Sequence, residues 1–458
     1  MNTAPRPPMP RSIRYVYAFS AVNALMWTII LGTPMVLFFK ELGASATMIG
    51  MVSSMVPLFN MLQLPAARYA DRIGCKTLMV RGWTSRSIFV LMLAVLAWQS
   101  ARLPPNLVMW LAMLLLALFS MIRGFSCCGY YPWITKLLPE ERRGEFAAGD
   151  SISASLASTL IMVGSAWYVA VALPQFKYAG LFLFAYVAAL SSVFFLRRIP
   201  PVQTVGLASG PGRVPWKALI FHPPFFRIIR FSMVYFFFIA AAGVFWVPML
   251  RDLAGVSARW ILGFSAVSGI LSALFSMIGG RVVDRVGSRP LLGLSGSMFF
   301  INFLCWAMAA AGLLPFNIWV FGVTLVTGAM GGSFYQVSTL RLLMAAVPEA
   351  GRSHFFALSS VMNGTMNGLM PIFWGMFLDG MRAHETDGVL ARWGAWHWNQ
   401  YSVLYVLLML GMVLFQVVRR KIEEPRAMHT DEFLRELYRT VPGWLWGRVV
   451  MFWRRMDI

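Results

Sequence analysis

The eight residues DRIGCKTL at positions 71–78 decide the fold, because a related stretch, DRVGSRPL, returns at positions 284–291. Each stretch follows a long apolar block, and the two lie 213 residues apart. A second pair of loop motifs, LPE at 138–140 and VPE at 347–349, repeats at a separation of 209 residues. Two unrelated motifs that repeat at nearly the same separation indicate duplication. The sequence therefore predicts two related halves.

The composition indicates that the solvent of this chain is a lipid bilayer. Of its 458 residues, 59% are hydrophobic and 12% are charged, whereas an ordinary soluble domain has about 25% charged residues. A helix needs about 20 apolar residues to cross the hydrocarbon core. Six apolar blocks lie in the first half (15–39, 46–66, 82–100, 106–131, 146–171 and 178–196) and six in the second (227–250, 259–279, 291–312, 316–345, 354–378 and 401–418). We therefore expect twelve transmembrane helices.

The basic residues predict the orientation. Most of the 39 lysines and arginines fall in loops on the side of the membrane that also holds both termini, and such an excess marks the cytoplasmic side. The net charge of +21 is therefore explained by topology, and no nucleic-acid partner is expected. The short loops favour the inner (cytoplasmic) membrane of a bacterium as the location.

Four regions are expected along the chain. Residues 1–196 form a first six-helix bundle, 197–226 a Gly- and Pro-rich cytoplasmic linker, and 227–420 a second six-helix bundle. Residues 421–458 read as an amphipathic tail with interleaved Trp and Arg, which suits a membrane surface with anionic headgroups. A tail that binds a partner protein is the alternative.

The repeated loop resembles the signature of the major facilitator superfamily, and the resemblance extends to about residue 420. The signature residues present are Asp71, Arg72, Gly74 and Lys76 in the first copy and Gly280, Asp284, Arg285, Gly287 and Arg289 in the second. Ala67 replaces the leading glycine, and Cys75 and Ser288 replace the first basic residue. The resemblance implies an all-α integral membrane fold of two pseudo-symmetric six-helix bundles. It also implies secondary transport by alternating access.

The resemblance further implies that these loops control which side of the membrane is open. Asp71 would contact the first turn of the helix predicted at 354–378, near Ser353, and Arg142 or Arg143 would contribute from the loop after the fourth helix. The other interpretation is a basic loop that only sets topology.

Polar and aromatic residues within the predicted helices are the candidate substrate contacts, because polar groups are costly in hydrocarbon unless a cavity or partner accepts them. Arg123 could bind an anionic substrate group or form a structural pair. The other candidates are neutral: Asn23, Trp27, Phe238, Trp246, Tyr335, Gln336, Asn363 and Asn367. Helix packing is the alternative role for them.

Several functions are not supported by the sequence. No acidic residue lies at the middle of a span, and Asp150 is near a helix end. No hydrolase motif, metal-binding cluster or cofactor motif is present, so we expect a monomeric carrier of a small solute rather than an enzyme. A sugar-like solute and an organic anion both remain open as substrates. A membrane sensor or partner-binding protein that keeps the transporter fold is the alternative function.

Overall fold

A computed structural model of the chain describes residues 9–138, 143–202, 223–346, 352–386, 392–393 and 396–422. The first half contains α1 (Ile13–Ile30), α2 (Thr33–Glu41), α3 (Ala46–Phe59), η1 (Asn60–Leu62), α4 (Gln63–Ile73), α5 (Cys75–Gln99), α6 (Pro105–Ser126), η2 (Cys127–Gly129), α7 (Tyr130–Leu137), α8 (Arg143–Val171), η4 (Pro174–Phe176) and α9 (Lys177–Arg198). The second half contains α11 (Pro223–Ala254), α12 (Ala258–Val286), α13 (Ser288–Ala310), α14 (Ile318–Ala346), α15 (Arg352–Thr386), β1 (Arg392–Trp393), β2 (Trp396–His397) and α16 (Gln400–Arg419).

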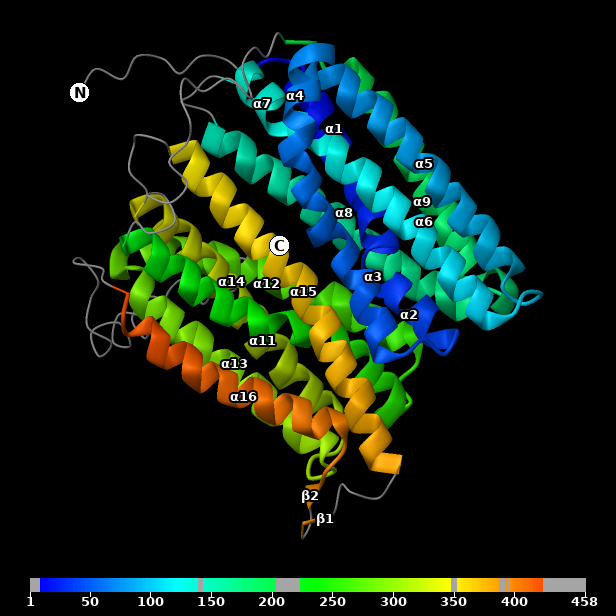
Figure 1. The fold of residues 1–458 in the computed structure, drawn as a ribbon, viewed down its shortest axis with the longest axis vertical. Coiled ribbons are helices and arrows are strands. Elements are labelled where there is room, and N and C mark those ends of the chain that lie inside the picture. Colours follow the sequence, from blue (N-terminus) through cyan, green and yellow to red (C-terminus); the bar gives the residue numbers. More distant parts are fainter. Residues whose placement is uncertain are drawn as a thin grey trace, which may run out of the picture.

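The predicted all-α membrane architecture is confirmed. Each predicted block contains a helix, and within the described residues ten helical segments are long and apolar enough to cross a membrane, beside the shorter apolar helix Ala46–Leu62. In Figure 1 the first half, blue to teal, lies beside the second half, green to orange, and α3 and α15 run along each other between them. The helix α5 begins at Cys75 rather than at position 82, and the β1–β2 hairpin was not predicted.

Prolines explain why several membrane segments are broken. Proline has no N–H to donate to the carbonyl four residues earlier. The two short 3₁₀ turns η1 and η2 each end three residues before a proline, Pro65 and Pro132 respectively. In each case the carbonyl that loses its donor lies within the turn. The first membrane segment breaks between α1 and α2, where Gly32 precedes Pro34.

Two pairs of helices make the most extensive contacts between the halves. The helix α3 packs against α15, and α8 packs against α12. The helix bundle has two ends, which we call the Lys40 end and the Gly74 end. The Lys40 end holds the turn from α2 to α3, and the Gly74 end holds the turn from α4 to α5.

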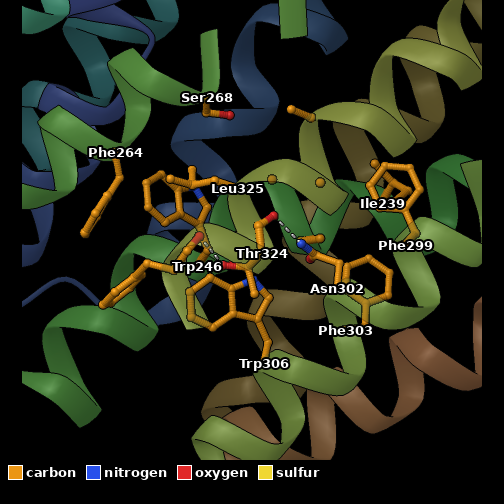
Figure 2. A pocket seen from close by; sticks show the side chains of 15 residues that line it. Ile239, Trp246, Phe264, Ser268, Phe299, Asn302, Phe303, Trp306, Thr324 and Leu325 are labelled. Carbon is orange, nitrogen blue, oxygen red and sulfur yellow. Dashed lines mark hydrogen bonds between the residues drawn. The ribbon is translucent and has the colours of Figure 1, made fainter. Parts of the chain in front are cut away.

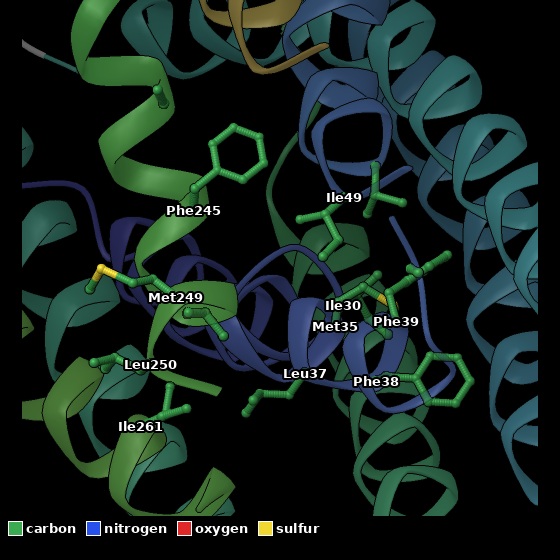
Figure 3. Packing of buried hydrophobic residues seen from close by; sticks show 14 of the residues in the cluster. Ile30, Met35, Leu37, Phe38, Phe39, Ile49, Phe245, Met249, Leu250 and Ile261 are labelled. Carbon is green, nitrogen blue, oxygen red and sulfur yellow. The ribbon is translucent and has the colours of Figure 1, made fainter. Parts of the chain in front are cut away.

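Among the described residues, the halves share a buried core only toward the Lys40 end. There, side chains of α1, α2 and α3, including Ile30, Phe38 and Ile49, belong to the same buried cluster as Phe245 and Ile261 of α11 and α12 (Figure 3). The clusters near the Gly74 end each contain residues of one half, in the part of the chain that the structure describes. The halves are therefore joined at the Lys40 end.

Candidate functional site

Arg86 is a charged side chain buried inside the first half. Its exposed fraction is 0%. One Nη atom donates a 2.6 Å hydrogen bond to Oδ1 of Asn23 on α1, and Trp83 Nε1 donates to the same oxygen at 3.2 Å. The guanidinium carbon lies 3.9 Å from the ring centroid of Trp83 and 5.3 Å from that of Phe119. An amide oxygen and two aromatic faces thus surround this cation.

The hydrogen-bonding capacity of Arg86 is not filled. Its Nε and Nη1 atoms are buried and have no hydrogen-bond partner. Among the described residues no carboxylate accepts a hydrogen bond from it. A buried charge without a paired counter-charge is costly, so the site favours a negative charge nearby.

Arg123 lies close to Arg86, and the two guanidinium groups repel each other electrostatically. Its Nη1 donates a 2.8 Å hydrogen bond to Oδ1 of Asn60, and its guanidinium carbon lies 4.3 Å from the ring centroid of Trp27. Asn60 begins the turn η1, and Arg123 comes four residues before η2. Arg123 therefore links the two segments that prolines interrupt, and it is half-buried rather than enclosed.

Gly124 explains how these segments come so close. A Cβ atom at Gly124 would lie 2.1 Å from the Phe59 carbonyl oxygen. Only a glycine fits there, because a Cβ atom cannot approach backbone atoms so closely. The arginines, Asn23, Asn60 and Trp27 thus form one cluster between α1, η1, α5 and α6, which we call the arginine cluster.

A second feature lies inside the second half. A cavity of about 240 Å³ lies between α11, α12, α13 and α14, and Trp246 lines it together with Trp306 and Asn302 (Figure 2). We call it the aromatic cavity. The predicted candidate Trp246 therefore lies in a cavity, although it lies in the other half from the arginine cluster.

The remaining candidates are placed more widely. Phe238 lies in an apolar groove between α11, α15 and α16, where it contacts Trp374 and closes over Gly411. Tyr335 is buried and stacks on Tyr235, and Gln336 is exposed.

Asn363 and Asn367 are half-buried on α15. The Asn363 amide nitrogen lies 3.4 Å from the Ser359 hydroxyl, and its Oδ1 is buried without a partner. Neither belongs to the arginine cluster or the aromatic cavity as these are defined. The polar and aromatic residues that the sequence analysis selected therefore lie in several different environments.

The two signature loops have matching backbone geometry. Gly74 and Gly287 begin α5 and α13 with φ angles of +84° and +94°, a region that other residues rarely adopt. Lys76 donates to the carbonyl of Arg197 at the end of α9, and Arg289 donates to that of Arg420 at the end of α16. In each half the basic signature residue thus binds the last turn of the sixth helix of the same half.

Other parts of the predicted gate lie outside what the structure describes. Arg142 is outside the described residues, and so are the side chains of Asp71, Arg143, Asp284 and Arg285. Arg72 is exposed, and Gly280 has open space around its α-carbon. The predicted amphipathic tail and most of the linker also lie outside the described residues.

Polar contacts between the halves are found at the Lys40 end. Asp379 at the end of α15 accepts hydrogen bonds from the backbone N–H groups of Ala46 and Thr47 at 3.0 and 2.9 Å. It thus caps the first turn of α3, where a negative charge is favourable.

Ion pairs strengthen the same end. Lys40 pairs with Asp252 at 2.7 Å, and Glu41 pairs with Arg251 at 3.2 Å. Tyr401 donates to Asp252 as well, at 2.6 Å. In this structure the Lys40 end is therefore closed by side chains of both halves.

Sequence reasoning missed Arg86, Asn60, Asn302 and Asp379 as functional candidates. Arg86 lies within a predicted membrane segment, but nothing in the sequence tells which way its side chain points. Asn60 lies in the turn η1, and its contact with Arg123 could not be predicted without knowing where the helix is interrupted. Asp379 could not be recognised because its partner lies more than 300 residues earlier in the chain.

Comparison with known proteins agrees with the fold. The model of the Major Facilitator Superfamily matches residues 16–371. No curated protein matches the sequence. The chain belongs to the major facilitator superfamily, and it is a multi-pass membrane transporter of that family.

Solved structures of several transporters are similar. A mutant of the nucleoside transporter NupG aligns with a TM-score of 0.68 at 15% identity, covering 90% of this chain and all of that one. A bacterial homologue of the iron transporter ferroportin, in its inward-facing state, gives 0.66 at 14% identity, covering 91% and 99%. A D-xylose–proton symporter gives 0.65 at 14% identity, covering 90% and 98%. At these identities the likeness defines the fold alone.

Proposed function

We propose that this chain carries a small organic anion across the membrane and that the arginine cluster binds the anionic group. The observation that carries the proposal is Arg86, which is completely buried with two guanidinium nitrogens unpartnered. Arg123 beside it adds a second positive charge at the half-buried face of the cluster. An anion would compensate both charges and fill the open hydrogen-bonding positions.

The environment increases the strength of such binding. Within a membrane protein the local dielectric constant is low, so charge–charge attraction is stronger than in water. Guanidinium groups are suited to carboxylate and phosphate oxygens because their N–H donors are planar and paired. Trp27 supports Arg123 through its ring face.

The shape of the bundle supports entry from the Gly74 end. Ion pairs, the Asp379 cap and a shared apolar core hold the halves together at the Lys40 end. If both termini are cytoplasmic, as the distribution of basic residues predicts, the Gly74 end faces the cytoplasm. The arrangement then corresponds to an inward-facing state.

The proteins with similar structures include a nucleoside transporter and a D-xylose–proton symporter, whose solutes differ chemically. The fold therefore does not select the substrate. The arginine cluster favours an anion over an uncharged sugar, because a neutral solute would leave the buried charge of Arg86 uncompensated.

The experiment is uptake into proteoliposomes of labelled mono- and dicarboxylates, organic phosphates, sugars, nucleosides and amines, with and without proton or sodium gradients. We expect saturable uptake of one anion class. A hydrogen bond to a charged group contributes about 1.5–3 kcal/mol, so Arg123→Gln should lower kcat/KM by about 10- to 150-fold. Arg123→Lys should retain a larger part of the activity because it keeps the charge.

Arg81→Gln is the control, because it makes the same change of charge at an exposed arginine outside the arginine cluster. Its uptake should equal that of the wild type. Uptake of a neutral solute that is unaffected by Arg123→Gln would contradict the proposal. Absence of uptake across the whole panel would also contradict it and would favour a sensor.

A further inference from the structure

We propose that the aromatic cavity of the second half is a binding site for an uncharged, planar aromatic ring that carries an N–H donor. This site is separate from the arginine cluster, and the inference does not depend on the anion proposal. Its walls come from four consecutive helices, α11 to α14, so a bound ring would contact the second half alone.

The walls of the cavity are suited to a flat ring. Trp246, Phe264, Trp306 and Phe321 all line it. The rings of Phe264 and Phe321 stack with centroids 4.5 Å apart and an interplanar angle of 20°, and Trp306 meets Phe321 edge-on at 5.9 Å. Aromatic pairs gain energy in both of these geometries. A flat guest can therefore add a further stacked or edge-on contact.

Polar groups in the lining give the cavity a direction. Asn302 donates its amide nitrogen to the Thr324 carbonyl at 2.7 Å and to the Thr327 hydroxyl at 3.1 Å. These bonds fix the amide, while its Oδ1 accepts no hydrogen bond within the described part of the chain. A ring N–H can donate to this oxygen. Ser268 supplies a hydroxyl on the opposite helix.

Charge is the property that separates this cavity from the arginine cluster. No lysine, arginine, aspartate or glutamate is among the residues that line it. A charged ligand would lose its hydration without gaining a counter-charge, and this is unfavourable. The lining therefore selects a neutral ring.

The size of the cavity limits the ligand. Its volume of about 240 Å³ is slightly below the roughly 300 Å³ at which ordinary ligand pockets begin. One or two fused rings fit this space, whereas larger molecules do not. Indole is the simplest probe with the required shape and donor.

Gly243 provides the means to test the site. This glycine lines the cavity, is exposed, and has no atom within 4 Å of the position of an added Cβ. A leucine there can extend into the cavity without displacing backbone. Gly322 on α14 is the matched control, since it is also exposed with open space but does not line the cavity.

The experiment is calorimetric titration of indole into the full-length protein in phosphatidylcholine nanodiscs, with empty nanodiscs subtracted. We expect saturable binding to the wild type and to Gly322→Leu, and binding at least about tenfold weaker to Gly243→Leu. The analogue 1-methylindole lacks the donor and should bind about 3- to 10-fold more weakly. Indole-3-acetate should not gain affinity over indole, because the cavity has no cation.

Equal, non-saturable heats for the wild type and both glycine variants would overturn the proposal, because they would indicate partition into lipid. If Gly243→Leu does not fold, Gly243→Ala and Trp246→Leu replace it, and unchanged indole affinity in both would have the same meaning. The readout is independent of transport. A failure of the anion proposal therefore leaves this result unaffected.

Discussion

The two halves of the molecule share a scaffold but differ in what they enclose. Both use a glycine with positive φ to begin the third helix and a basic residue to bind the end of the sixth. Arg86 and Phe299 are 213 residues apart, as are the two signature loops, and so they occupy equivalent places on α5 and α13.

The equivalent residues make different contacts. Arg86 donates to Asn23 of the first helix, whereas Phe299 packs against Tyr235 of the seventh with ring centroids 5.9 Å apart. A cation in one half thus corresponds to an aromatic ring in the other. After duplication, the turns that shape each bundle stayed alike, while one interior came to contain a buried cation and the other an uncharged cavity.

The largest effect is expected when a charge is moved into the neutral half. Phe299→Arg would place an unpaired cation among Phe303, Tyr235 and Gly331, and an uncompensated buried charge costs about 3–5 kcal/mol. Thermal unfolding in detergent should show a large decrease in Tm. Phe299→Leu controls for lost ring volume and should cost less. A normal Tm for Phe299→Arg would mean that the interiors are not as different as the structure indicates.

The reciprocal exchange should mainly affect transport. Arg86→Phe replaces a buried ion by a ring that can pack against Trp83 and Phe119, and such replacements are often neutral for stability. Loss of the charge should lower anion uptake by about 10- to 150-fold, the equivalent of about 1.5–3 kcal/mol. Proteoliposome uptake and Tm measured on the same preparation separate the two effects. A large loss of Tm with full specific uptake would make Arg86 a structural residue.

The shared scaffold should respond equally in both halves. Gly74→Ala and Gly287→Ala each place a side chain at a φ that only glycine adopts readily, which costs about 1–3 kcal/mol. The two variants should lose similar amounts of stability, measured by urea or thermal unfolding. Gly322→Ala, in a helix with open space around it, is the control. Unequal losses would indicate that the two turns contribute differently to the stability of the fold.

The smallest effect is expected for the basic signature residues. Lys76→Met and Arg289→Met each remove one hydrogen bond to a helix end, and we expect a loss of at most about 1 kcal/mol in either half. Thermal unfolding again provides the measurement. If one variant alone abolished transport with its stability intact, that residue would also serve in gating between the halves.

Much of the fold could be predicted from the sequence. Each apolar block contains a helix of the structure, because hydrophobic length is a local property. The repeated DR-G motif predicted the two equivalent turns, and the φ angles of Gly74 and Gly287 agree with that equivalence.

The candidate site could be predicted only in part. Arg123 was identified because an arginine within a span is unusual, but its partner Asn60 depends on how two broken helices cross. Phe238 was a candidate substrate contact, and in the structure it lines an apolar groove beside α16. In a fully apolar helix the sequence shows no polar side, so the direction of a side chain follows from packing alone.

The hydrogen bonds of Asp379 to α3 allow opening of the Lys40 end to be followed by hydrogen exchange. The carboxylate of one half holds the amide protons of Ala46 and Thr47 in the other, and these protons become free to exchange with water only when the Lys40 end separates. Their deuterium uptake therefore counts opening events without any attached label. A solute that favours one state of the carrier would change that rate, even before its own movement could be followed.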